Sequence, residues 1–191
     1  MKQENEDILY QRYPKIFDQT LSFGFECKDG WFNIIYKLCD LIQYHIDWSE
    51  DNHARNTQWM KIRDAALEGD WEPFNELYGH FSEKDTKFYE SLKADILDEI
   101  PNWRIPKPVI PQVVAVQVKE KFGTLRFYFN GGDDHIDGLV AMAEGMSSVT
   151  CEECGVPGKL RKGSWVQTLC DQHAEGREEM VWNNPFDKND S

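Results

Sequence analysis

The sequence Cys151-Glu152-Glu153-Cys154, followed after fifteen residues by Cys170-Asp171-Gln172-His173, decides the fold of the C-terminal part of this chain. Each stretch places two metal-ligating residue types three positions apart, as zinc-binding loops do. We expect one tetrahedral Zn²⁺ site built from Cys151, Cys154, Cys170 and His173. Because four protein ligands leave no position for a water molecule, this zinc would be structural rather than catalytic. The alternative is that four unrelated residues of a reduced protein share this spacing.

The residues between and after the ligands predict a small zinc module over 151–182. Short strands are expected at 159–161 and 165–169, and Lys162-Gly163-Ser164 would close the hairpin between them. The run from 171 to 182 is rich in helix-forming residues, so the second ligand pair is expected in the first turn of a helix. A knuckle, a hairpin and a helix in this order predict a treble-clef-like module.

Length and composition predict one further domain. The chain has 191 residues, 40% of them hydrophobic, which is enough to bury a core. We expect an α+β domain at 1–150 that contains a helical insertion at about 51–105, and a flexible tail at 183–191. Five cysteines are too few for a secreted disulfide framework, and the N-terminus has no apolar signal segment. No apolar run is long enough to cross a bilayer, so we expect a reducing cytoplasm and no membrane partner.

The formal net charge of −13 disfavours nonspecific binding to nucleic acid, because such binding depends on Lys and Arg at the phosphates. Two short clusters of Lys and Arg residues are local exceptions to this acidity, and they could face one another as a small basic patch, with Trp165 as a further contact residue. Nucleic-acid binding through these groups is therefore the main alternative function, although separate solvated charges explain them more simply. The basic residues are Lys119, Lys121 and Arg126 in a central hairpin, and Lys159, Arg161 and Lys162 in the zinc hairpin.

An amphipathic helix is expected after Asp29-Gly30, because apolar residues then recur at helical spacing. Three shorter helical patterns follow in the insertion, at 59–67, 71–78 and 88–97. Their outer faces are rich in Asp and Glu, which normally indicates a solvated surface. The functional interpretation is an acidic surface that engages a basic groove of a partner protein. The apolar stripe of the first helix consists of Trp31, Ile35, Leu38 and Ile42, widened by Ile34, Leu41 and Ile46.

A central β-hairpin is predicted by alternating apolar residues at 114–118 and 125–129, with Phe122-Gly123-Thr124 as its turn. A helix capped by Asp133 or Asp134 follows it and leads into the first cysteine pair. The expected fold class is therefore α+β, with helices packed on the central hairpin and the treble-clef-like zinc module at the C-terminus.

Catalytic chemistry has weak support in the sequence. Asp133, Asp134 and His135 are the obvious acid-base or metal candidates outside the cysteine motif, and they would serve a divergent metal-dependent nuclease. Helix capping explains the two aspartates more simply, and their charge argues against a phosphate site at Gly131-Gly132. His45 is expected to be a packed or surface histidine. The sequence contains no phosphate loop, nucleophile elbow or metalloprotease motif, so we predict no enzymatic activity and no catalytic residues.

Three segments together resemble small, uncharacterised proteins encoded by phages and prophages. The resemblance implies a phage origin, a bacterial host cell and a zinc-stabilised fold, but it supplies no catalytic residues. We therefore expect a non-enzymatic phage accessory protein that binds a host or defence protein through an acidic surface, with inhibition of that protein as the consequence. The segments are Phe25-Glu26-Cys27-Lys28-Asp29-Gly30-Trp31-Phe32, Gln117-Val118-Lys119-Glu120-Lys121-Phe122-Gly123-Thr124-Leu125-Arg126-Phe127-Tyr128 and the zinc segment.

Overall fold

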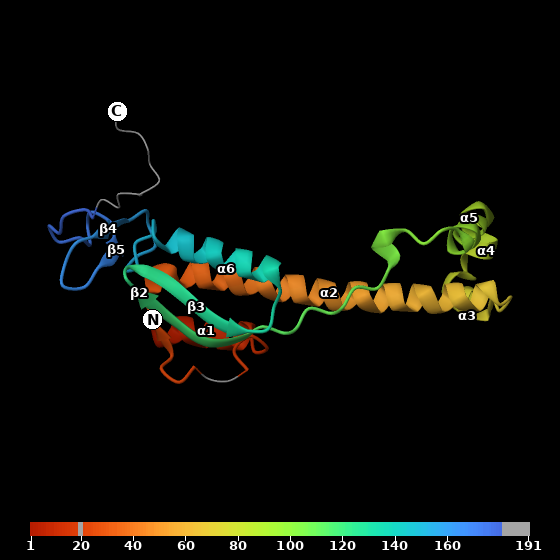
Figure 1. Cartoon of the computed structure of the whole chain (residues 1–191), viewed down its shortest axis with the longest axis horizontal. Coiled ribbons are helices and arrows are strands. Elements are labelled where there is room, and N and C mark those ends of the chain that lie inside the picture. The colour runs from red at the N-terminus through yellow and green to blue at the C-terminus, as the bar shows by residue number, and fades with distance from the viewer. Residues whose placement is uncertain (19–20, 181–191) are drawn as a thin grey trace, which may run out of the picture. The chain divides into compact units, whose positions relative to one another are not determined.

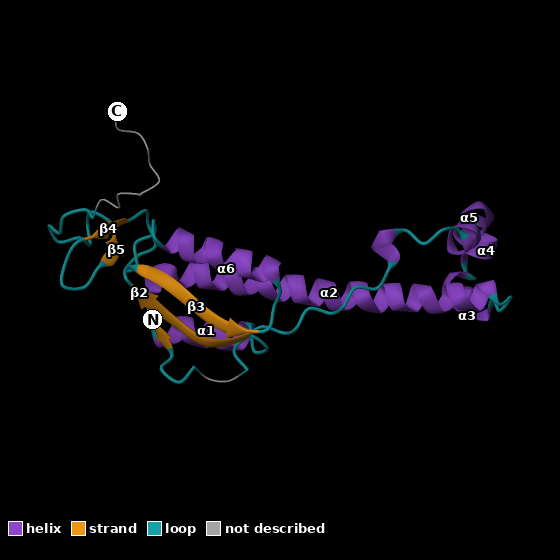
Figure 2. Cartoon of the chain, viewed as in Figure 1, coloured by secondary structure: helices purple, strands orange, loops and turns teal. Residues whose placement is uncertain are grey.

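The computed structural model describes residues 1–18 and 21–180, so the predicted tail at 183–191 lies outside the described residues. The chain is a mixture of helices and strands with a small sheet, which confirms the mixed class expected from the sequence (Figure 2). The elements, in chain order, are α1 (Gln3–Arg12), β1 (Phe25–Glu26), η1 (Asp29–Trp31), α2 (Phe32–Leu67), α3 (Glu72–Tyr78), α4 (Phe81–Lys84), α5 (Thr86–Leu97), η2 (Asn102–Arg104), β2 (Val114–Lys121), β3 (Thr124–Asn130), α6 (Asp134–Ser147), β4 (Lys159–Arg161) and β5 (Gln167–Leu169).

The chain divides into two compact units. The first unit contains Met1–Ile46 and the chain from Ile110 onward, and the second contains Asp47–Val109. The predicted helical insertion at 51–105 lies within the second unit. Helix α2 supplies residues to both units.

The sheet of the first unit has the order β1-β2-β3. Strands β2 and β3 are antiparallel, and β1 pairs in parallel with β2 through Phe25 opposite Val118 and Glu26 opposite Lys119. A strand of two residues is too short to show an alternating pattern, so the sequence pattern does not predict β1. The parallel pairing brings the N-terminal segment to the edge of the central strands.

One apolar core holds the first unit together. The predicted stripe is buried except for Ile34 and Leu41, which are half-buried, and it packs with residues from the sheet and from α6, which runs alongside the first part of α2 in Figure 1. Buried side chains from these elements include Trp31, Ile35, Leu38, Ile42 and Ile46 of η1 and α2, Val118, Leu125 and Phe127 of the strands, and Ile136, Val140 and Ala143 of α6.

Helix α2 is longer than the sequence pattern predicted. We expected the pattern at 59–67 to form a separate helix, whereas Phe32–Leu67 is a single helix of 36 residues. No Pro or Gly occurs in this stretch, so nothing in the backbone interrupts the helical hydrogen bonds. The helix ends just before Gly69, whose φ of 88° is a left-handed conformation that terminates helices.

The second unit is built from the end of α2 with α3, α4, α5 and η2. Asp85 caps α5 by accepting a hydrogen bond from the backbone N–H of Phe88 at 3.0 Å. Arg63 donates to the carbonyl groups of Ile96 and Asp98, at the end of α5 where helical carbonyls lack partners. The small core of this unit consists of Trp59, Ile62, Ala66, Phe74 and Ile96.

A close backbone contact joins the start of η1 to the first cysteine pair. The N–H of Gly30 donates to the carbonyl of Glu152 at 2.7 Å, and the indole N–H of Trp31 donates to the carbonyl of Thr150 at 2.8 Å. A Cβ atom at position 30 would lie 2.1 Å from the carbonyl oxygen of Cys151. Glycine is therefore required at position 30 for this contact.

We expect Gly30→Ala to lower the free energy of unfolding by about 1–3 kcal/mol, because the new methyl group collides with backbone rather than with a movable side chain. Gly138→Ala is the matched control. A Cβ atom at Gly138 meets no atom within 4 Å, and this glycine lies in the interior of α6, so alanine should raise stability by up to about 1 kcal/mol. Thermal unfolding followed by circular dichroism would compare the two variants, and equal unfolding temperatures would contradict the contact.

Candidate metal centre

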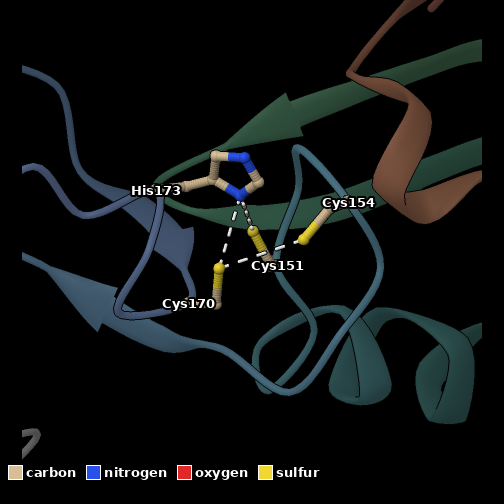
Figure 3. A group of neighbouring side chains, drawn as sticks. All are labelled: Cys151, Cys154, Cys170 and His173. Carbon is tan, nitrogen blue, oxygen red and sulfur yellow. Dashed lines mark hydrogen bonds between the residues drawn. The ribbon is translucent and has the colours of Figure 1, made fainter.

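Three thiols and one imidazole meet at the C-terminal end of the first unit. The Nδ1 atom of His173 lies 3.5 Å from Sγ of Cys151 and 3.3 Å from Sγ of Cys170, and Sγ of Cys154 lies 3.9 Å from Sγ of Cys170 (Figure 3). All four ligand atoms lie within 4.8 Å of one another, so together they could hold a metal ion. The structure thus brings together the four residues that the sequence motif predicted.

Tight turns position the first cysteine pair. The N–H of Gly155 donates to the carbonyl of Cys151 at 2.8 Å, and the N–H of Cys151 donates to the carbonyl of Val156 at 2.8 Å. Gly155 has a φ of 78°, a conformation that favours glycine. These bonds fold the chain back on itself, so both sulfur atoms face the same space.

The antiparallel pair β4 and β5 delivers the second pair of ligands. Its register places Lys159 opposite Leu169, next to Cys170. The N–H groups of His173 and Ala174 then donate to the carbonyl of Cys170 at 3.1 and 2.9 Å. This single turn directs the His173 ring back towards the thiols.

The predicted helix from 171 to 182 is wrong for the part that the structure describes, which ends at 180. Residues 171–180 form turns, and Glu179 makes a bridge with Arg161 of β4. Glu175 and Gly176 have φ values of 49° and 80°, and two successive left-handed residues cannot continue a right-handed helix. Composition alone predicted the helix and did not account for the turn at Glu175-Gly176.

The electrostatics of the centre favour a thiolate at Cys151. Burial would raise the pKa of this thiol, but hydrogen bonds from the backbone amides of Cys170 and Cys154 and from the His173 side chain lower it to about 7. A lowered thiol pKa makes the thiolate, which is the metal-binding form, accessible near neutral pH. Cys151 is therefore prepared to bind a cation.

The residues between the first two cysteines attach the centre to the rest of the first unit. Glu153 forms an ion pair with Lys28. Glu152 is buried, and its backbone N–H donates to the carbonyl of Thr168 at 2.9 Å. Burial raises the pKa of the Glu152 carboxyl, and a hydrogen bond from Gln167 partly opposes this shift.

The turn of the central hairpin also packs on the metal-binding segment. The buried hydroxyl of Thr168 donates to the carbonyl of Gly123 at 2.6 Å. A Cβ atom at Gly123 would lie 2.4 Å from Cδ1 of Leu160, so this turn too approaches β4 and β5 closely. Both glycines that contact the metal-binding segment, Gly30 and Gly123, lie in segments that carried the phage resemblance.

Most of the basic residues considered for nucleic-acid binding have acidic partners. Lys159 pairs with Glu179 at 2.7 Å and Lys162 pairs with Glu178 at 3.3 Å. The buried Arg161 pairs with Asp171, and Arg126 lies 3.5 Å from Glu144. Lys119 and Lys121 differ, because they form no ion pair with a described residue, and they line one groove together with Trp165.

The structure places the candidate acid-base residues at the start of α6. Asp133 caps this helix by accepting from the N–H of Ile136 at 3.1 Å, and His45 Nε2 lies 3.1 Å from its second oxygen. The ring of His135 lies 4.3 Å from the ring of His45. Burial would raise the pKa of Asp133, but the hydrogen bonds from His45 and from Ile136 lower it below its ordinary value. Sequence reasoning missed His45 as a partner because no local pattern connects residues so distant in the chain.

Within the described ranges 1–18 and 21–180, the group of Cys151, Cys154, Cys170 and His173 is the one set of three or more His, Cys, Asp or Glu side chains that could hold a single ion. No helix in these ranges is both long enough and apolar enough to cross a membrane. The chain matches no protein-family model, curated protein or solved structure to which it was compared.

The five cysteines should differ sharply in their reaction with a thiol reagent. Cys27 and Cys39 are buried in the core, and burial raises the pKa of Cys27 to about 12, so neither should react in the folded protein. Cys151, Cys154 and Cys170 should be protected by metal and should react once a chelator removes it. Titration with Ellman's reagent would measure this difference. Reaction of all five thiols after chelation under native conditions would contradict the assignment of Cys27 and Cys39 to the buried core.

Proposed function

We propose that the centre binds Zn²⁺ as a structural ion. A tetrahedral zinc with Zn–S distances of about 2.3 Å and a Zn–N distance of about 2.0 Å requires S···S separations of about 3.8 Å and S···N separations of about 3.5 Å. The observed 3.9 Å between Cys154 and Cys170, and 3.3 and 3.5 Å from His173 to the other two sulfurs, agree with these values. Soft thiolate ligands also favour zinc over magnesium or calcium. We propose that the knuckle and hairpin form a treble-clef-like module, in which the ion would give the support that a helix at 171–180 would otherwise provide.

The purified protein should contain one equivalent of zinc. Cys154→Ser should remove most of this zinc and lower the unfolding temperature, because binding free energy at a structural site is also folding free energy. Cys39→Ala, which changes a cysteine in the apolar core, should keep one equivalent. Metal content measured by mass spectrometry would test both variants, and full zinc retention in Cys154→Ser would exclude the site.

We further propose that the chain is a non-enzymatic binding protein and that its second unit recognises a partner protein. The observation that supports this is the apolar surface of residues 47–109, all of which the structure describes. Only five hydrophobic side chains are buried there, whereas eight large hydrophobic side chains are at least 40% exposed. Contiguous exposed apolar surface is typical of protein interaction sites, and we infer such a surface here. The exposed residues are Trp48, Leu67, Leu77, Phe88, Leu97, Trp103, Ile105 and Val109.

The charge of the second unit gives the expected chemistry of the partner. Residues 47–109 contain 14 acidic and 8 basic side chains. Glu72, Glu76, Glu83 and Glu90 are exposed, and none of them forms an ion pair with a described residue. Unpaired carboxylates near apolar side chains suit a partner with a basic surface, and long-range attraction would accelerate association.

The resemblance to phage proteins supports a specific setting for this binding. A phage accessory protein acts in a bacterial cell, where basic grooves belong largely to proteins that bind nucleic acid. We propose that the partner is such a host or defence protein, and that occupation of its basic groove inhibits it. The zinc ion would then stabilise the first unit and would not contact the partner protein.

The full-length protein should capture a bacterial partner from nuclease-treated lysate at a stoichiometric ratio. Replacing Glu72, Glu76, Glu83 and Glu90 by Gln should lower the captured amount at least about tenfold, because the attraction to a basic groove is lost. The matched control replaces Glu4, Asp7, Asp134 and Asp137 of α1 and α6 by their amides, which removes the same charge from the first unit. Equal capture by both variants would overturn the acidic surface as the binding site.

A further inference from the structure

A groove in the first unit lies between the turn of the β2–β3 hairpin and the loop from Ser164 to Val166. Its volume is about 640 Å³, within the range of small-molecule sites. Phe122 and Trp165 contribute exposed rings, with 73% and 63% of their surfaces accessible. Lys119 and Lys121 line the same groove.

The two carboxylates of the groove, Glu26 and Glu120, accept hydrogen bonds from neutral groups and form no ion pair with the two lysines. One oxygen of Glu120 accepts the N–H of Gly123 at 2.6 Å, and the other accepts the indole N–H of Trp165 at 2.8 Å. Glu26 accepts a hydrogen bond from Gln117 at 2.8 Å. Neither Lys119 nor Lys121 forms an ion pair with a described residue.

The lysines instead lie over aromatic rings. The Nζ atom of Lys119 lies 5.5 Å from the ring centre of Tyr128, and that of Lys121 lies 5.7 Å from the ring centre of Phe122. These contacts keep the ammonium groups beside aromatic faces without neutralising their charge. Although Glu26 and Glu120 line the same groove, neither is ion-paired with a lysine, so both ammonium groups remain able to pair with an anionic group of a ligand.

Phe122 has a backbone conformation that the hairpin turn requires but that a bulky residue disfavours. Its φ is 55° and the following Gly123 has a φ of 79°, as in the two-residue turns that prefer Asn-Gly. A bulky residue in this conformation costs about 1–2 kcal/mol, and the ring is exposed, so it returns no burial energy. Strain of this kind at an exposed aromatic residue is a feature of ligand sites.

Trp165 is likewise held in place without being buried. Its hydrogen bond to Glu120 joins the loop after β4 to the hairpin turn and fixes the edge of the indole. The ring face therefore remains available for stacking. A preoriented aromatic ring loses less conformational entropy when it binds a planar group.

We propose that this groove binds a nucleotide, with the base stacked on Phe122 and Trp165 and the phosphate paired with Lys119 and Lys121. Stacking platforms with nearby cations are the usual means of holding single bases. The net charge of −13 opposes a long nucleic acid, whereas one or a few nucleotides bring little opposing charge into its field. This site is independent of the proposed partner surface, because it uses residues of the first unit only.

Calorimetric titration of the full-length, zinc-loaded protein at low salt with 5′-mononucleotides would test the proposal. The wild type should bind them, and the affinity should fall as salt is added. Phe122→Asn should weaken binding at least about fivefold by removing a stacking ring. Because Asn adopts this turn conformation more readily, the unfolding temperature of Phe122→Asn should equal or exceed that of the wild type. Lys119→Gln with Lys121→Gln should weaken binding about tenfold.

Matched controls are Phe23→Ala, which removes a ring that is 77% exposed elsewhere, and Lys84→Gln with Lys87→Gln in the second unit. Both should bind as the wild type does. Titration with a single-stranded oligonucleotide of about eight nucleotides would show whether the natural ligand is a free nucleotide or part of a strand. The ligand that binds more tightly, mononucleotide or oligonucleotide, identifies the source.

Three outcomes would overturn the proposal. The first is no binding of any mononucleotide or oligonucleotide at millimolar concentration. The second is unchanged nucleotide affinity in Phe122→Asn and in the double lysine variant. The third is binding of a glutamate-rich peptide that depends on the same residues while nucleotides do not bind, which would assign the groove to an acidic peptide.

Discussion

The backbone contact between Gly30 and the cysteine knuckle is the constraint on which the first unit depends. The N–H of Gly30 is bonded to the carbonyl of Glu152, and the absent side chain lets the two chains meet at a distance that no other residue permits. The adjoining Trp31 inserts its ring into the core and donates to the carbonyl of Thr150. One short segment therefore sets the start of α2, the edge of the sheet and the position of the first two metal ligands.

A metal ion would complete this arrangement from the other side. Cys151 and Cys154 follow α6 directly, whereas Cys170 and His173 follow β5, and the ion would join these two positions. The turn of the central hairpin is fixed to the same region by the bond between Thr168 and Gly123. Metal binding and packing thus support the same elements, and loss of the ion would loosen both β4 and β5 and the groove beside them.

The acidity of the chain is organised differently in its two units. In the metal-binding segment, acidic residues pair with Lys159, Arg161 and Lys162, so most of the local charge is neutralised. In the second unit four exposed glutamates form no ion pair with a described residue, and eight large hydrophobic side chains are exposed as well. The two proposed surfaces therefore differ in chemistry: an acidic and apolar surface would suit a basic protein, and a small aromatic groove with two lysines would suit a nucleotide.

The sequence by itself determined the four residues of the candidate metal centre, the apolar stripe of the first helix and the two central strands, because each depends on local spacing. It could not determine the single helix Phe32–Leu67, since short apolar patterns do not show where one helix joins the next. Composition predicted a helix after Cys170, where the turn at Glu175-Gly176 prevails. The parallel pairing of β1, the contact of Gly30 with Cys151 and the groove between Phe122 and Trp165 were decided by tertiary structure alone, because they join residues whose separation in the chain leaves no periodic signal.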